Sequence, residues 1–241
     1  MHMTDFTTEL RTAAAAADIV LTEDQLLKFT RYDALLIDWN ERMNLTAITE
    51  PHDVAVKHMI DSLTAYDKQL FSGAPTVIDV GTGAGFPGLP LKIYDPSIRL
   101  TLMDSLAKRL TFLETVIEDL GLTGVSCVHA RAEDAAREPQ HRERYDLAVS
   151  RAVARLPVLL EYTLPFVKKG GHLLALKGRT AEEEADASQH ALKVLGGRIE
   201  AIRPVTLPGL DDKRAVLTIE KTAPTPKAYP RKAGTPAKKP L

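Results

Sequence analysis

The sequence has one cysteine, few aromatic residues (5%) and no long apolar run. A single cysteine excludes an internal disulfide and a cysteine-ligated zinc cluster, and no other metal site is expected. Cys127 lies in an apolar stretch, where it is expected to be a small core residue. The chain has no run of about 18 apolar residues, which a membrane helix would need, and its start does not resemble a secretion signal. These absences predict a cytoplasmic protein without a membrane segment.

Charge is distributed unevenly along the chain. Six of the 31 basic residues lie between Lys221 and Leu241, where no acidic residue occurs. The rest of the chain therefore has 25 basic and 32 acidic residues and is acidic overall. Five prolines share this tail, which excludes a helix and predicts an extended, adaptable strand. A basic tail on an acidic body suggests an anionic partner, although a solvated, disordered terminus is an equal alternative on charge alone.

Residues 1–72 have the pattern of a helical N-terminal extension. A helix is expected over residues 5–17, and a second one opens at Thr22, whose spacing to Gln25 is that of a capping box. Pro51 is placed to begin a third helix.

Residues 73–221 alternate between short apolar strands and helices, which indicates one α/β domain, and residues 222–241 form the basic tail. We expect strands over 77–80, 98–103, 125–128, 147–149, 172–176, 198–206 and 214–220. Helices are expected over 87–94, 106–120, 132–137, 158–167 and 182–195, with a turn at 169–171. This order predicts a doubly wound, mostly parallel seven-stranded sheet whose last two strands are antiparallel neighbours.

A glycine-rich loop follows the first strand, where ligands bind to such sheets. Gly83, Gly85 and Gly88 formally match the dinucleotide fingerprint, but that match alone is weak. Asp79 before the loop would repel a pyrophosphate and suits the cationic methionine end of S-adenosylmethionine, and Pro87 interrupts the dinucleotide register. These two residues favour S-adenosylmethionine, bound by the loop from Gly81 to Gly85, over NAD.

Two carboxylates flank the loop, and each has a purely structural alternative. Asp104 closes the second strand, where a carboxylate accepts both ribose hydroxyls of either cofactor; it would otherwise cap the next helix with Ser105. Asp79 would otherwise have only a capping role at the end of its strand.

Eight stretches of the chain together resemble one family. They are 39–46, 58–63, 79–88, 104–105 with Lys108 and Arg109, 131–133, 150–154, 176–178 and 229–231. The family is the glucose-inhibited division protein B methyltransferases, bacterial enzymes that methylate N7 of one guanine in small-subunit (16S) ribosomal RNA. The resemblance runs from about residue 20 to the C-terminus and implies the class I fold of S-adenosylmethionine-dependent methyltransferases.

The resemblance also implies roles for single residues around the cofactor. Gly81 and Phe86 would contact its methionine and adenosine parts, and Asp104 its ribose. Ala132 and Glu133 would border the adenine, with a backbone amide reading a ring nitrogen. The alternative for Glu133 is an acid placed at a helix N-terminus by the helix dipole.

Two basic residues are implied on the substrate side. Arg151 would lie at the junction of cofactor and substrate, and Lys177 would reach the RNA or the target guanine. The alternatives are a surface Arg151 paired to an acid such as Glu161, and a solvated Lys177 at a strand end. His58 and His172 are expected to be structural.

The chemistry of guanine N7 agrees with what the chain lacks. N7 has an exposed lone pair and no proton to remove, so no general base is required. The slot after the fourth strand holds Ser150-Arg151-Ala152, in place of the Asn/Asp-Pro-Pro-aromatic signature of enzymes that methylate exocyclic amines. We expect a monomer that acts on ribosomal RNA within the small subunit. The alternatives are a methyltransferase for a small molecule or protein, and a nucleotide-binding assembly factor without activity.

Overall fold

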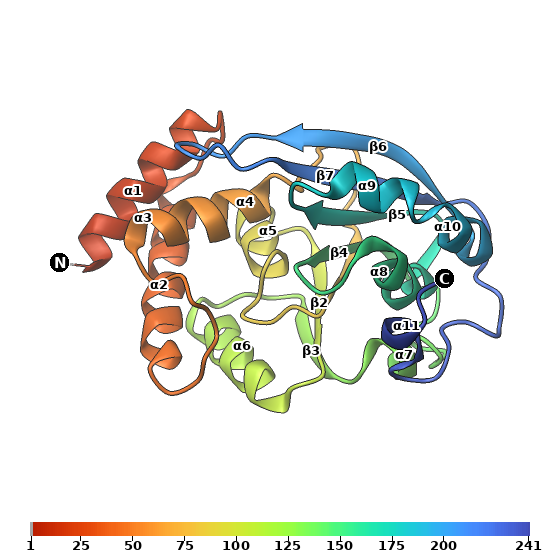
Figure 1. The fold of residues 1–241 in the computed structure, drawn as a ribbon. Coiled ribbons are helices and arrows are strands. Elements are labelled where there is room, and N and C mark those ends of the chain that lie inside the picture. Colours follow the sequence, from red (N-terminus) through yellow and green to blue (C-terminus); the bar gives the residue numbers. More distant parts are fainter. Residues whose placement is uncertain (1) are drawn as a thin grey trace.

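A computed structural model describes residues 2–241, with side chains from Asp5 onward, and shows one sheet between layers of helices (Figure 1). The strands are β1 (Thr76–Val80), β2 (Arg99–Asp104), β3 (Val125–His129), β4 (Tyr145–Arg151), β5 (Val167–Lys177), β6 (Gly197–Val205) and β7 (Arg214–Lys221). Their order is β3-β2-β1-β4-β5-β7-β6. Strands β1 to β5 are parallel, whereas β7 is antiparallel to both neighbours. The predicted fold class is confirmed.

The helices fill the expected intervals between strands. They are α1 (His2–Ala16), α2 (Glu23–Asn40), α3 (Pro51–Val54), α4 (Asp61–Leu63), α5 (Gly88–Tyr94), α6 (Ala107–Asp119), α7 (Ala132–Ala135), α8 (Leu156–Thr163), α9 (Ala181–Asp186), α10 (Gln189–Leu195) and α11 (Thr235–Lys238). A π-helical turn, Ala55–Ile60, joins α3 to α4, and a 3-10 turn, Leu164–Phe166, follows α8. No helix among residues 2–241 is long and apolar enough to cross a membrane.

Three local predictions are wrong. The helix expected over 182–195 is divided into α9 and α10 by a turn at Ala187 and Ser188, where the Ser188 hydroxyl donates to the Glu184 carbonyl oxygen (2.6 Å). The turn expected at 169–171 lies inside β5, where the register with β4 shifts between Tyr145 and Leu147. Gly170, with φ +83°, absorbs this irregularity.

The third wrong prediction concerns the tail. Residues 222–241 are neither a free terminus nor an extended strand. They run back over α7 and α8 and include the short helix α11 (Figure 1). Pro236 is compatible with that helix because it occupies the first turn, where a proline removes no helical hydrogen bond.

Alternation along the strands divides the core into two clusters. On β1, Val77 faces one side of the sheet, where it joins the helices α1, α2, α5 and α6, and Ile78 faces the other side with α8 to α10. The N-terminal helices therefore share a core with the sheet. Phe6 and Leu10 of α1 are fully buried, and burial of each such side chain contributes about 1.5–3 kcal/mol.

The second helix is fixed at its start and along its inner face. The capping box between Thr22 and Gln25 is present, as predicted. Further along α2, the hydroxyl of the fully buried Tyr32 donates a hydrogen bond to the carbonyl oxygen of Ala84 in the glycine loop. The N-terminal extension thus supports the loop directly.

Candidate active site

The predicted site residues lie at the carboxyl edge of the sheet. Strand β1 has β2 on one side and β4 on the other. Successive strands are therefore added in one direction from β1 to β3 and in the opposite direction from β4 onward. This switch point is where ligands bind in doubly wound folds. The glycine loop follows β1, and Asp104, Arg151 and Lys177 are the last residues of β2, β4 and β5.

Gly81 opens the loop in a conformation that suits glycine. Its φ is +74°, and its backbone N–H donates to the carbonyl oxygen of Met103 (2.9 Å). A Cβ added at this position would lie 2.6 Å from Cγ2 of Val153. Val153 follows Ala152, a non-glycine residue with φ +57°. The segment after β4 therefore bends over the loop and packs onto Gly81.

Asp79 lies beneath the loop and is fully buried. Its Oδ2 accepts hydrogen bonds from the Thr82 hydroxyl and the Gly88 amide (2.8 Å each), so it stabilises the loop and the start of α5. Its Oδ1 is buried and has no hydrogen-bond partner among the described residues. Burial raises the pKa of Asp79 to about 7, although these two donors and Arg151 act in the opposite direction.

Asp104 connects the loop to the second strand. Its Oδ2 accepts from the Gly83 amide (2.9 Å) and from Arg109 (3.2 Å), and its Oδ1 accepts from the Leu106 amide (2.9 Å). The structural alternative is therefore partly realised, since Asp104 forms an Asx turn before α6, with Leu106 rather than Ser105.

A cavity of about 130 Å³ opens beside the loop, and we call it the glycine-loop cavity. Its lining residues are Val80, Gly81, Met103, Asp104, Ser105, Ala130, Arg131, Ala132, Glu133, Val153 and Tyr162. The structure thus brings together Gly81, Asp104, Ala132 and Glu133.

Gly85 and Phe86 face away from this cavity, toward the N-terminal layer. A Cβ on Gly85 would lie 2.5 Å from the Tyr32 hydroxyl, so this position has no room for a side chain. The Phe86 ring is nearly buried and stacks between His58 (4.5 Å between centroids) and Tyr32 (5.4 Å). The guanidinium carbon of Arg151 lies 5.0 Å from the same ring centroid, which is a cation–π distance.

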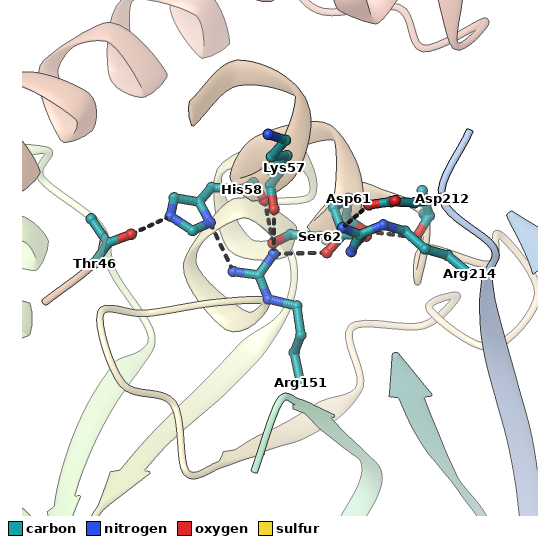
Figure 2. A network of polar contacts seen from close by, with 9 residues as sticks. Thr46, Lys57, His58, Asp61, Ser62, Arg151, Asp212 and Arg214 are labelled. Atoms are coloured by element: carbon teal, nitrogen blue, oxygen red, sulfur yellow. Dashed lines mark hydrogen bonds and ion pairs between the residues drawn. The ribbon is translucent and has the colours of Figure 1, made fainter. Parts of the chain in front are cut away.

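Arg151 is held by the helical segment that precedes the sheet (Figure 2). Its Nη1 donates to Asp61 Oδ2 (2.7 Å) and to the Lys57 carbonyl oxygen (2.8 Å), and its Nη2 donates to His58 Nδ1 (3.2 Å). Lys57 and His58 belong to the π-helical turn, in which the helix is widened, and Asp61 is the residue after it. Such turns are frequent at functional sites. Arg151 therefore pairs with Asp61, and the alternative pairing with Glu161 is wrong.

His58 has a defined protonation state in this network. Arginine only donates, so Nδ1 of His58 accepts, and the ring proton on Nε2 is directed to the Thr46 hydroxyl oxygen at 2.8 Å. Burial, followed by the charge of Arg151, lowers the pKa of His58 to about 3. His58 is thus a neutral positioning residue, in line with the expected structural role.

A second cavity, of about 350 Å³, lies across Val153 from the first, and we call it the strand-end cavity. It is lined by Asp61, Thr64, Arg151–Arg155, Leu176–Gly178, Glu184, Val205 and Arg214–Val216. Val153 lines both cavities and is 37% exposed. Among the lining residues, Asp61 accepts from Arg151 through one oxygen and from Arg214 through the other (3.2 Å).

Lys177 lies in the wall of the strand-end cavity with little exposure. Its side chain is 9% exposed, and Nζ contacts Glu184 Oε2 (2.8 Å) and the Ala154 carbonyl oxygen (2.6 Å). Glu184 Oε2 also accepts from the Leu156 amide (2.6 Å). In this arrangement Lys177 fastens the segment after β4 to α9 and does not extend into solvent.

Several neighbours of the predicted residues were not predicted as site residues. Asp61 and Val153 lie inside stretches that carry the family resemblance, but only the fold places them beside Arg151 and Gly81. Glu184 lies in an ordinary run of acidic residues, and nothing in that run distinguishes it. The described part of the chain contains no group of three or more His, Cys, Asp or Glu side chains arranged to hold a metal ion.

Comparison with known proteins decides the family. The model of the GidB family, described as rRNA small subunit methyltransferase G, matches residues 25–209. The chain belongs to this family. GidB relatives share about half of their residues with it, and the resemblance drawn from the motifs is confirmed.

Two of these relatives show how far the likeness extends. A protein named Ribosomal RNA small subunit methyltransferase G from Desulfitobacterium hafniense is 55% identical over 93% of this chain and 92% of its own length. A protein of the same name from Desulforamulus reducens is 49% identical over 99% of this chain and 100% of its own length. The GidB likeness therefore includes the basic tail.

Solved structures of more distant proteins share the fold. A 16S rRNA (adenine(1408)-N(1))-methyltransferase variant from Catenulisporales acidiphilia has a TM-score of 0.53 and 16% identity, over 69% of this chain and 92% of that one. P. horikoshii TYW2, solved in complex with MeSAdo, has a TM-score of 0.52 and 14% identity, over 68% and 62%. At these identities the likeness concerns the fold alone.

Proposed function

We propose that this chain transfers the methyl group of S-adenosylmethionine to N7 of a specific guanine in small-subunit (16S) ribosomal RNA. Beyond family membership, one observation carries the proposal. The glycine-loop cavity and the strand-end cavity adjoin at Val153, at the switch point of the sheet. One cavity suits a nucleoside-bearing cofactor, and the other suits a base that approaches it.

The residues present fit S-adenosylmethionine. Asp104 lines the glycine-loop cavity and provides acceptors for ribose hydroxyls, and the close contact of Gly81 with Val153 leaves no room for a side chain there. Above about pH 7, where Asp79 is ionised, its unpartnered Oδ1 is a negative centre beneath the loop that suits the cationic methionine end. When bound, this cofactor supplies an electrophilic methyl group on a sulfonium.

Arg151 has the position and free donors to orient a guanine. Its three hydrogen bonds use both Nη1 donors and one Nη2 donor, which leaves Nε–H and one Nη2–H of its five donors. Guanine presents O6 beside N7 on one edge, and both are acceptors. A donor from Arg151 to O6 would orient N7 toward the cofactor and would disfavour adenine, which has an amino group in that place.

The same network is suited to a reaction without a general base. His58, the histidine in contact with Arg151, has its Nδ1 occupied and its pKa lowered to about 3, so it is not a proton acceptor at neutral pH. Methylation at N7 leaves a positive charge on the purine. The Asp61 carboxylate lines the strand-end cavity and reduces the positive charge of Arg151 and Arg214, which would otherwise oppose this product.

Other cations are available to the RNA backbone. Arg155, Arg179 and Lys213 are exposed, and their side chains have no partner among the described residues. Arg155 lines the strand-end cavity, and the other two line an open groove that shares Gly178 and Arg214 with it. Lys177, in contrast, would act by holding Ala154 and Glu184 in place. We propose that Arg155, Arg179 and Lys213 bind phosphates next to the target base. We also propose that the protein acts in the cytoplasm as a monomer.

The test is incubation of the protein with labelled S-adenosylmethionine and undermethylated small ribosomal subunits, followed by chemical cleavage at N7-methylguanine. Label on one guanine of the RNA is expected. Label on protein, on exocyclic nitrogens or nowhere would refute the reaction. Arg151→Ala should lower kcat/KM roughly a hundredfold with little loss of cofactor affinity. Arg11→Ala, on α1 and outside the lining of both cavities, should leave kcat/KM and cofactor affinity unchanged.

A further inference from the structure

The C-terminal tail contacts the wall of the glycine-loop cavity. Arg142, which precedes β4, donates to the Thr225 and Tyr229 carbonyl oxygens (2.8 and 2.9 Å) and directs the tail along α7 and α8. In Figure 1, α11 lies beside α7. The tail therefore packs against the domain as part of its fold, although residues 222–241 lie beyond the 25–209 match of the family model.

Arg231 anchors the tail to α8. Its backbone N–H donates to Glu161 Oε1 (2.7 Å), and its guanidinium donates to both carboxylate oxygens, at 2.6 to 3.1 Å. The Glu161 side chain has no exposure to solvent. A buried carboxylate is costly unless it is paired and hydrogen-bonded, so the tail satisfies a group that would otherwise destabilise α8. The next residue along α8, Tyr162, lines the glycine-loop cavity.

A second contact of the tail is with a cavity residue directly. The Gly234 backbone N–H donates to Oε1 of Glu133 at 2.8 Å. Glu133 lines the cavity, and its side chain is only 4% exposed. Arg131 also donates to Oε1, at 3.5 Å, whereas Oε2 has no hydrogen bond in the described part of the chain. The tail thus occupies one oxygen of a residue that lines the cavity and leaves the other oxygen, Oε2, free to accept a hydrogen bond.

We propose that the tail is a wall of the cofactor pocket, in which Arg231 and Gly234 are positioning residues that orient Glu133 so that Oε2 accepts the 6-amino group of the cofactor's adenine. This inference rests on the proposed function. An ionised carboxylate is only an acceptor, so it favours the amino group of adenine and disfavours the 6-oxo group of hypoxanthine. Cofactor binding and docking of the tail must then stabilise each other, because coupling between two sites is reciprocal.

The experiment compares two ligands on the full chain by titration calorimetry: S-adenosylhomocysteine and its counterpart with hypoxanthine in place of adenine. The unaltered protein should prefer the adenine compound by about tenfold or more, as expected for a hydrogen bond to a charged group. Arg231→Ala should lower the affinity for the adenine compound about tenfold and the affinity for the hypoxanthine compound less than about twofold. Arg231→Lys should restore part of the preference.

Lys232→Ala is the matched control, because Lys232 is exposed, has the same charge and has a side chain without a partner among the described residues. It should keep the full preference for adenine. An unchanged preference in Arg231→Ala, or an equal loss for both compounds, would overturn the inference. If the unaltered protein binds neither compound, the proposed function itself fails, and this result differs from the other two.

A second measurement applies if Arg231→Ala does not fold. In the unaltered protein, S-adenosylhomocysteine should slow hydrogen exchange at the Gly234 amide more than at the Thr225 amide, which bonds to Glu143 away from the cavity (2.7 Å). Equal slowing at both amides would contradict a specific link between the tail and Glu133.

Discussion

Asp79 gives the most direct test of how burial and charge act in this fold. Asp79→Asn keeps the shape of the side chain and removes its ability to ionise. The amide oxygen takes the place of Oδ2 and still accepts from Thr82 and Gly88, and the amide nitrogen takes the place of the unpartnered Oδ1.

The expected change in stability depends on pH. Burial raises the pKa of Asp79 from its ordinary 3.8 to about 7. The unfolded chain therefore loses this proton near pH 4, whereas the folded protein keeps it to about pH 7, so the folded protein is destabilised as pH rises between these values. Three pH units correspond to about 4 kcal/mol at most. The buried amide N–H₂ of Asn costs about 1–3 kcal/mol at all pH values.

Asp79→Asn should thus be about as stable as the unaltered protein at pH 5, where roughly 1.6 kcal/mol of this destabilisation already offsets the cost of the amide, and more stable by about 1–3 kcal/mol at pH 8. Urea unfolding at pH 5, 6, 7 and 8 measures this difference. Asp18→Asn, at an exposed position with φ +55°, controls for a general effect of lost charge. A difference that does not change with pH would refute the reasoning. Cofactor affinity should fall in Asp79→Asn, because the negative centre beneath the loop is lost.

Three further predictions concern the walls of the two cavities and the groove beside them. Gly81→Ala should weaken S-adenosylmethionine binding in calorimetry, because the new Cβ would lie 2.6 Å from Val153; the added change Val153→Ala should restore part of the affinity, and no restoration would mean that backbone strain alone is responsible. Lys177→Ala should destabilise the protein by about 2–4 kcal/mol in urea unfolding, because it removes the partner of the buried Glu184 carboxylate. The double variant Lys177→Met with Glu184→Gln should lose less stability, and a loss equal to the sum of the two single variants would contradict the pairing. Arg179→Ala should reduce the slope of log affinity for ribosomal RNA against log salt by about one; an unchanged slope in a filter-binding series would remove Arg179 from the RNA interface.

Local patterns in the sequence were sufficient for most of the fold. The capping box at Thr22 and the left-handed residue Gly196 after α10 are encoded by neighbours within a few positions. The alternation of apolar strands with helices determines a parallel sheet, and the glycine loop marks its switch point. Features that depend on contacts between distant residues were harder to predict.

The tail shows this limit. Its prolines and charges describe the segment alone and favour an extended, solvated chain. The decisive partners, Glu161 and Glu133, lie 70 and about 100 residues earlier. The same holds for Arg151, whose partner Asp61 lies 90 residues away. Lys177 has a nearer partner, Glu184, but that residue stands in a run of acidic residues in which nothing marks it as buried. In each case a second, buried charge determines where the side chain lies.

The π-helical turn at Ala55–Ile60 affects how this site can vary in evolution. Here the Asp61 amide bonds to the Val56 carbonyl oxygen, five residues back, so the turn holds one residue more than an ordinary helix. Loss of a single residue would restore the ordinary helix and rotate one side of the segment by about 100° relative to the other. His58 and Asp61 would then no longer both face Arg151. We therefore expect relatives that keep this network to tolerate many substitutions in the segment while keeping its length unchanged.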